Sequence, residues 1–149
     1  MLHDLQETKD FVKTHEGYRN KVYYDTLGYA TIGVGHKVQK SDAFKAGEEY
    51  PEAQLMAVYD TDFHKAYDEA KALCAAQLGA PGKEELVRII TCLVFQMGKG
   101  GVSKFRKMWA ALKVHDYETA AHELLDSRFA RQAPERANQT AALIRELGA

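Results

Sequence analysis

The stretch EGYRNKVYYDTLGYATIGVGH, from Glu16 to His36, decides more about the fold than any other part of this chain. Residues 22–24 and 29–32 are rich in aromatic and β-branched side chains, which favour strands. Asp25–Gly28 lies between them and has the composition of a turn. We therefore predict a β-hairpin, followed by an irregular exit at the glycines of 33–35.

Two carboxylates flank this hairpin in different settings. Residues 2–15 show apolar side chains at helical spacing, and Gly17 is a natural C-cap, so a predicted helix ends near Glu16. Asp25 lies at the predicted hairpin tip, so both carboxylates can project into one opening. Glycoside hydrolysis requires such a pair, one protonated and one ionised. Thr31, on the second strand, offers a hydroxyl that can hold a water between them.

Each of these side chains also has a simpler interpretation. A glutamate at a helix end is commonly a solvated surface residue, and its position near the negative end of the helix dipole is unfavourable for its charge. An aspartate such as Asp25 is common in turns because its side chain bonds to nearby backbone.

A second long element follows the hairpin. Pro51 stands at a favoured first helical position, and no glycine or proline interrupts the chain again until Gly79. A helix over 51–78 would span about 42 Å, which exceeds the core of a domain this small. We predict that it joins two lobes, with a cleft beside it.

The remaining chain is expected to be helical. Residues 86–97 are apolar almost all round and are followed by helix-breaking glycines at 98, 100 and 101. Ser103 and Asp116 are predicted N-caps, and Pro134 is predicted to open the last helix.

The predicted fold is therefore α+β, mostly helical and two-lobed, within one domain covering 1–149. We expect a β-rich lobe over about 16–50, a connecting helix over 51–78, and a helical lobe over 79–149 that includes the N-terminal helix 2–15.

Composition excludes several classes of protein. The net charge is −1 and the pI is about 6.6, which argues against strong binding to nucleic acid or anionic membranes. Cys74 and Cys92 lack metal-binding spacing and are expected to be reduced and buried. His36 has no Cys/His companions that would suggest a metal site. Charged residues near the start and the lack of about 20 consecutive apolar residues predict neither a signal peptide nor a membrane span.

Three collinear motifs give a more specific indication. The pattern E-G-x-R-x-x-x-Y-x-D-T-x-G-Y-x-T-I-G-V-G-H resembles the N-terminal signature of the phage-type lysozymes, or endolysins, close to those of the T-even phages. LVFQMGKGGVSKF at 93–105 and SRFARQAPERA at 127–137 resemble that family's C-lobe motifs. The segment between His36 and Asp62 is about a dozen residues shorter than in the T-even enzymes.

The resemblance implies a function and a set of catalytic residues. The expected enzyme is a muramidase that hydrolyses the β-1,4 bond between N-acetylmuramic acid and N-acetylglucosamine, without a cofactor or metal. Glu16 would act as general acid, and Asp25 with Thr31 would activate water on the opposite face of the sugar, with inversion. Peptidoglycan is then the partner of a monomeric enzyme, and its glycan strand is expected in the cleft between the lobes.

Other residues acquire supporting or substrate-binding roles from the same resemblance. Arg136 matches an arginine that the family places beside the acid, and His36 and Asp62 match a structural pair. Phe95 and Gln96 match a pair that faces the cleft.

This sequence departs from the family pattern at several substrate-contact positions. Lys37, Met108 and Glu123 occupy such positions with different side chains, and Phe129 replaces a tryptophan. These changes affect the expected sugar and peptide preference but not the reaction.

Two rival functions share these motifs. A lytic transglycosylase would keep the acid without the second carboxylate, so Asp25 followed by Thr26 argues against it. The main alternative is a non-catalytic or weakly active wall-binding or structural module of the same fold, which is expected to have lost Glu16 or Asp25. For the enzyme, the family implies synthesis in the host cytoplasm and action on the wall in the periplasm after a holin opens the inner membrane.

Overall fold

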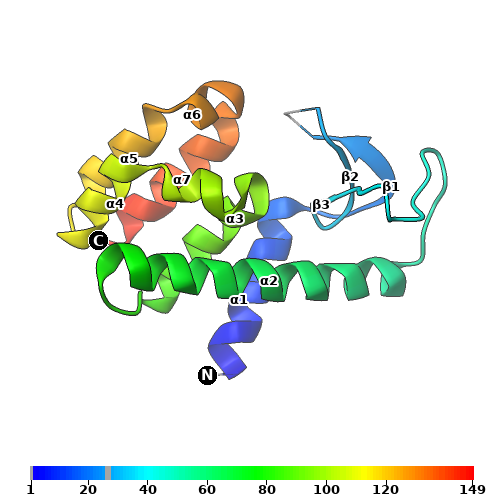
Figure 1. Cartoon of the computed structure of the whole chain (residues 1–149), viewed down its shortest axis with the longest axis horizontal. Helices are drawn as coiled ribbons and strands as arrows, with labels where there is room; N and C mark the ends of the chain where they lie inside the picture. Colours follow the sequence, from blue (N-terminus) through cyan, green and yellow to red (C-terminus); the bar gives the residue numbers. More distant parts are fainter. Residues whose placement is uncertain (1, 26–27) are drawn as a thin grey trace. The chain divides into compact units, whose positions relative to one another are not determined.

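The computed structural model describes residues 2–25 and 28–149, and Figure 1 shows its helices and strands in chain order. The chain divides into two compact units, Met1–Lys65 and Ala66–Ala149. The first unit contains α1 (Leu2–Glu16), β1 (Arg19–Tyr24), β2 (Ala30–Gly33) and β3 (His36–Lys37). Helix α2 (Glu52–Leu78) begins in the first unit, and the boundary falls within it. The mostly helical α+β fold expected from the sequence is confirmed.

The predicted hairpin is present and gains a third strand. Strands β1 and β2 are antiparallel, with Tyr23 opposite Thr31, and a bulge interrupts β1 before Tyr23. Strand β3 pairs with β2, with Lys37 opposite Thr31, so the strand order is β1-β2-β3. The Gly28 N–H donates to the Asp25 carbonyl at 3.0 Å. Thr26 and Leu27, at the centre of the predicted turn, lie outside the described residues.

Helix α1 is held to the first half of α2 within this unit. The Tyr59 hydroxyl of α2 donates to the Lys9 carbonyl, and Lys9 pairs with Asp60. Gly33 of β2 lies close to the same part of α2, since a Cβ atom on it would be 3.4 Å from Leu55 Cβ. The bonds to Tyr59 and Asp60 join α1 to residues of the first unit. They do not test the grouping of helix 2–15 with the helical lobe, which stays a prediction. Among the residues of this unit whose burial is described, the buried side chains are Thr8, Val12, Thr31, Ile32, Val34, Leu55, Tyr59 and Phe63.

The second unit is built from the end of α2 and the helices that follow. These are α3 (Glu84–Ser103), α4 (Arg106–Lys113), α5 (Tyr117–Leu125), α6 (Arg128–Gln132) and α7 (Pro134–Glu146), and α7 contacts α3, α5 and α6. Trp109 is 2% exposed and donates its indole N–H to the Val102 carbonyl at 3.0 Å. Buried Trp needs such an acceptor, so this bond fixes the turn between α3 and α4.

The helix ends agree only in part with the sequence predictions. Asp116 caps α5 by accepting from the Thr119 N–H at 3.1 Å, and Pro134 opens α7 as predicted. The predicted Ser103 cap is wrong. Ser103 ends α3, which resumes after a non-helical Gly98, and its hydroxyl donates to the Gly100 carbonyl at 2.7 Å.

Both cysteines are free and buried in the second unit, as expected. Burial raises the pKa of the Cys74 thiol to about 12. Gly82 lies directly against this residue, since a Cβ on Gly82 would be 3.1 Å from Cys74 Cβ and 3.3 Å from its sulfur.

Helix α3 corrects one expectation drawn from hydropathy. By length and composition alone, Glu84–Ser103 is long and apolar enough to cross a membrane, although no such stretch was expected. Half of the apolar window is buried inside the structure, as is typical of the core helix of a folded unit.

Candidate active site

Glu16 is the last residue of α1 and is partly buried. Gly17 ends the helix in the left-handed region at φ +75°, and its N–H donates to the Lys13 carbonyl at 2.9 Å. The carboxylate lies against Gly35, because a Cβ on Gly35 would stand 3.0 Å from Glu16 Oε2 and 3.5 Å from its Cδ. A side chain at position 35 would therefore displace the Glu16 carboxylate. Gly35 is also at φ +63°, which disfavours other residues there.

Asp25 follows β1 directly, and both its backbone N–H and its side chain bond to the backbone of Tyr29. The Asp25 N–H donates to the Tyr29 carbonyl at 3.0 Å, and the Tyr29 N–H donates to Asp25 Oδ1 at 2.8 Å. This is the local bonding expected of a turn aspartate. The same bond also fixes the direction of the carboxylate, so the turn role and a catalytic role are compatible.

Thr31 lies in the middle strand of the sheet and is only 2% exposed. Its hydroxyl donates to the Tyr29 carbonyl at 2.8 Å, so its proton is already used within the hairpin. A hydroxyl oxygen that donates still has lone pairs to accept with. A water held by Thr31 would therefore have to donate to it.

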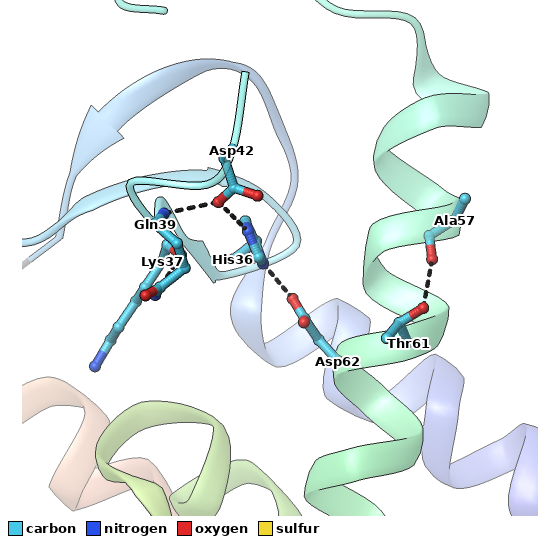
Figure 2. A network of polar contacts seen from close by, with 7 residues as sticks. All are labelled: His36, Lys37, Gln39, Asp42, Ala57, Thr61 and Asp62. Carbon is cyan, nitrogen blue, oxygen red and sulfur yellow. Dashed lines mark hydrogen bonds and ion pairs between the residues drawn. The ribbon is translucent and has the colours of Figure 1, made fainter. Parts of the chain in front are cut away.

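His36 on β3 is bonded through both ring nitrogens (Figure 2). Nδ1 lies 2.6 Å from Asp62 Oδ2 of α2, and Nε2 lies 2.9 Å from Asp42 Oδ2 of the loop after β3. Asp42 also accepts from the Gln39 N–H at 2.7 Å. Only a protonated imidazole donates from both nitrogens, so the geometry fits an imidazolium between two carboxylates.

The electrostatics of this network follow from its geometry. The hydrogen bond to Asp62 raises the pKa of His36 to about 9; burial opposes this shift, and Asp42 reinforces it. Burial disfavours the charged form of Asp42, yet the Gln39 N–H and His36 lower its pKa below the ordinary value. At neutral pH His36 is therefore charged.

Asp42 was not among the residues predicted from the sequence. It lies in a polar loop without periodicity, and its ability to bond to the backbone of Gln39 was the only local signal. Phe44 also packs within this loop. The centroid of its ring lies 6.1 Å from that of His36 and 4.9 Å from that of Tyr50, edge-on in both cases. The Tyr50 N–H donates to the Asn20 carbonyl at 3.1 Å.

The predicted site residues of the second unit differ in how deeply they are buried. Phe95 and Gln96 are partly buried on the last turns of α3 before Gly98, and Glu123 on α5 and Arg136 on α7 are also partly buried. Met108 is 1% exposed and belongs to the core of this unit. Substrate contact by Met108 stays a prediction.

No cluster of three or more His, Cys, Asp or Glu side chains suited to a metal ion occurs among residues 2–25 and 28–149.

Comparison with known proteins gives a consistent result. The model of a family described as Phage lysozyme matches residues 13–145. This chain is 29% identical to the pre-baseplate central spike protein of Enterobacteria phage T4, over an alignment that covers 91% of this chain but 27% of that protein. A "Probable T4-type lysozyme 2" of Dictyostelium discoideum is 26% identical over 94% of both chains. A peptidoglycan hydrolase of Pseudomonas phage phiKMV is 30% identical over 82% of this chain and 13% of its own length.

The His36 network predicts a specific dependence of stability on pH. The folded-state pKa of His36 is raised, so its contribution is complete below the unfolded value of 6.5 and is lost as pH rises through about 9. Asp42, with a lowered pKa, loses its contribution at the other end, as pH falls below 3.8. The parent should lose up to about 3 kcal/mol of unfolding free energy between pH 6 and 10, and His36→Asn should not show this loss.

Chemical denaturation of His36→Asn, Asp62→Asn and the double variant at pH 6 measures the coupling. We expect non-additivity of about 1–3 kcal/mol. His64→Asn is the control, because His64 pairs with Asp60 at 3.5 Å with both side chains half exposed, and such pairs contribute little. Simple additivity at pH 6, or an unchanged pH slope in His36→Asn, would contradict the assignment.

Proposed function

The chain belongs to the phage lysozyme family, and on that premise we propose that it hydrolyses the β-1,4 bond between N-acetylmuramic acid and N-acetylglucosamine in bacterial peptidoglycan. Its relatives named as lysozymes and as a peptidoglycan hydrolase support this substrate. The observation that carries the proposal is the Glu16 carboxylate, set at the end of α1 against Gly35, inside the matched region.

Glu16 is proposed as the general acid. A carboxylate at a helix C-terminus faces the negative end of the helix dipole, which disfavours its charged form and favours its protonated form. The proton passes from Glu16 to the glycosidic oxygen as the bond from that oxygen to the anomeric carbon breaks.

Asp25 and Thr31 are proposed to serve the incoming water. The Tyr29 N–H fixes the direction of the Asp25 carboxylate. Asp25 accepts a proton from the water while the water oxygen forms a bond to the anomeric carbon. Thr31 accepts a hydrogen bond from the same water. Attack on the face opposite the leaving group inverts the anomeric centre.

The second unit contributes the remaining proposed residues. Arg136 is proposed to support the acid, and Phe95, Gln96 and Glu123, together with Lys37 of the first unit, to contact the glycan. These assignments rest on the family resemblance and on partial burial. The chain spans about a quarter of the phage T4 spike protein, so a structural role within a larger protein is the alternative that the following tests address.

Replacing Glu16 by glutamine tests the acid directly. Glutamine keeps the size of the side chain but has no proton to give, so clearance of permeabilised Gram-negative cells should fall by at least about 100-fold. The matched control is Glu146→Gln, because Glu146 is also the last residue of a helix, α7, but is exposed. Circular dichroism would verify folding. Near-parental clearance by folded Glu16→Gln would rule out the assignment, and an inactive parent would favour the structural role.

Product stereochemistry tests the role of Asp25. An inverting hydrolase should first release the α-anomer of the new reducing end from this β-linked substrate, as observed by NMR early in the reaction. A β-anomer would indicate a covalent intermediate on the enzyme. An anhydro-sugar would instead indicate a transglycosylase.

The route to the wall is a further part of the proposal. We propose cytoplasmic synthesis followed by release to the periplasm through a holin, which fits two free, buried thiols. Bacteria expressing the protein without a holin should grow normally and lyse within minutes of chloroform addition. Spontaneous lysis, with the enzyme recovered in the periplasm before chloroform, would show a different route.

A further inference from the structure

Several aromatic side chains are exposed on the hairpin of the first unit or directly before it. Tyr18, Tyr24 and Tyr29 have 38%, 72% and 54% of their surface exposed. An isolated exposed tyrosine is ordinary and carries no functional meaning. What distinguishes Tyr29 is the face of the sheet on which it lies.

Tyr29 lies on the sheet face that carries the proposed water-activating residues. Thr31 is opposite Tyr23 in the ladder between β1 and β2, and Tyr29 and Asp25 are joined by two hydrogen bonds two residues further along that ladder. Side chains two residues apart in a strand point to the same face. Tyr24 pairs with Ala30, one residue away in each strand, and therefore belongs to the opposite face.

A contact between side chains supports this placement. The Lys37 ammonium lies 4.6 Å from the centroid of the Tyr29 ring, which is a cation–π distance. This contact favours one orientation of the ring, and 54% of the Tyr29 surface remains exposed. An aromatic side chain that is already ordered loses less entropy when a ligand packs on it.

We propose that Tyr29 is a carbohydrate-binding residue that stacks on a pyranose ring of the glycan strand, beside the ring attacked by the water at Asp25. The C–H groups on one face of a β-linked pyranose carry partial positive charge, and the face of an aromatic ring is negative. Lys37 orients the platform. This inference rests on the proposed function, because it places the ligand by reference to Asp25.

The side chain of Tyr29 can be removed without disturbing Asp25. It is the backbone N–H of Tyr29 that donates to Asp25 Oδ1, so Tyr29→Ala keeps this hydrogen bond. A loss of glycan binding in that variant would therefore report the ring, while the catalytic step itself should be nearly unchanged.

The test is calorimetric titration with a soluble tetrasaccharide of alternating N-acetylglucosamine and N-acetylmuramic acid, in a Glu16→Gln background that prevents cleavage. Tyr29→Ala should raise Kd by about tenfold, and Tyr29→Phe, which keeps the ring, should bind like the parent. Tyr24→Ala is the matched control, because it removes a more exposed tyrosine from the opposite face. In the active background, Tyr29→Ala should raise KM with little change in kcat.

The outcomes separate the subsite from the activity. Unchanged binding by Tyr29→Ala, in a protein whose parent cleaves peptidoglycan, would overturn the subsite and leave the proposed function standing. An equal loss in Tyr24→Ala would also overturn it, since the effect would not depend on the face. A parent that neither binds the tetrasaccharide nor clears cells would overturn both. If Tyr29→Ala does not fold, Tyr29→Leu provides the same comparison without a ring.

Discussion

A single imidazolium, that of His36, holds three segments of the first unit together. It lies on β3, bonds to Asp62 on α2, and bonds to Asp42 in the loop that follows the sheet. Since β3 also pairs with β2, the strand that carries Thr31 is fixed relative to α2 through these bonds. Breaking a partly buried pair of this kind leaves a charge without compensation, which costs more than the pair contributes when intact. The position of the sheet in this unit thus depends on one protonated ring.

Backbone geometry contributes to the placement of both proposed catalytic carboxylates. Glu16 is placed by the end of α1 and by the absence of a side chain at Gly35. Asp25 is placed by the N–H of Tyr29, and that bond depends on the hairpin register. Backbone hydrogen bonds of this kind are set by the fold and need no side-chain reordering during reaction. The fold of the hairpin is therefore part of the proposed chemistry.

Sequence reasoning succeeded where one local rule determined the structure. Turn residues between β-branched segments predicted the hairpin, and Asp116 and Pro134 marked helix starts because capping is a local property. It failed where tertiary packing decided the outcome. Ser103 has a side chain suited to capping, yet α3 continues beyond Gly98 and includes Ser103 as its last residue. Asp42 was missed because its partner, His36, is brought close only by the path of the loop.

The two units differ in whether thiol alkylation can detect their unfolding. Both thiols of the chain belong to the second unit, where burial excludes thiol reagents and holds the pKa of Cys74 near 12. The thiolate of Cys74, the reactive form, is thus almost absent while that unit is folded. Alkylation of the buried thiols therefore requires an opening of the second unit, and its rate reports such openings. The two native cysteines can therefore report local unfolding of the second unit. Alkylation does not detect unfolding of the unit that carries Glu16 and Asp25, because that unit contains no cysteine.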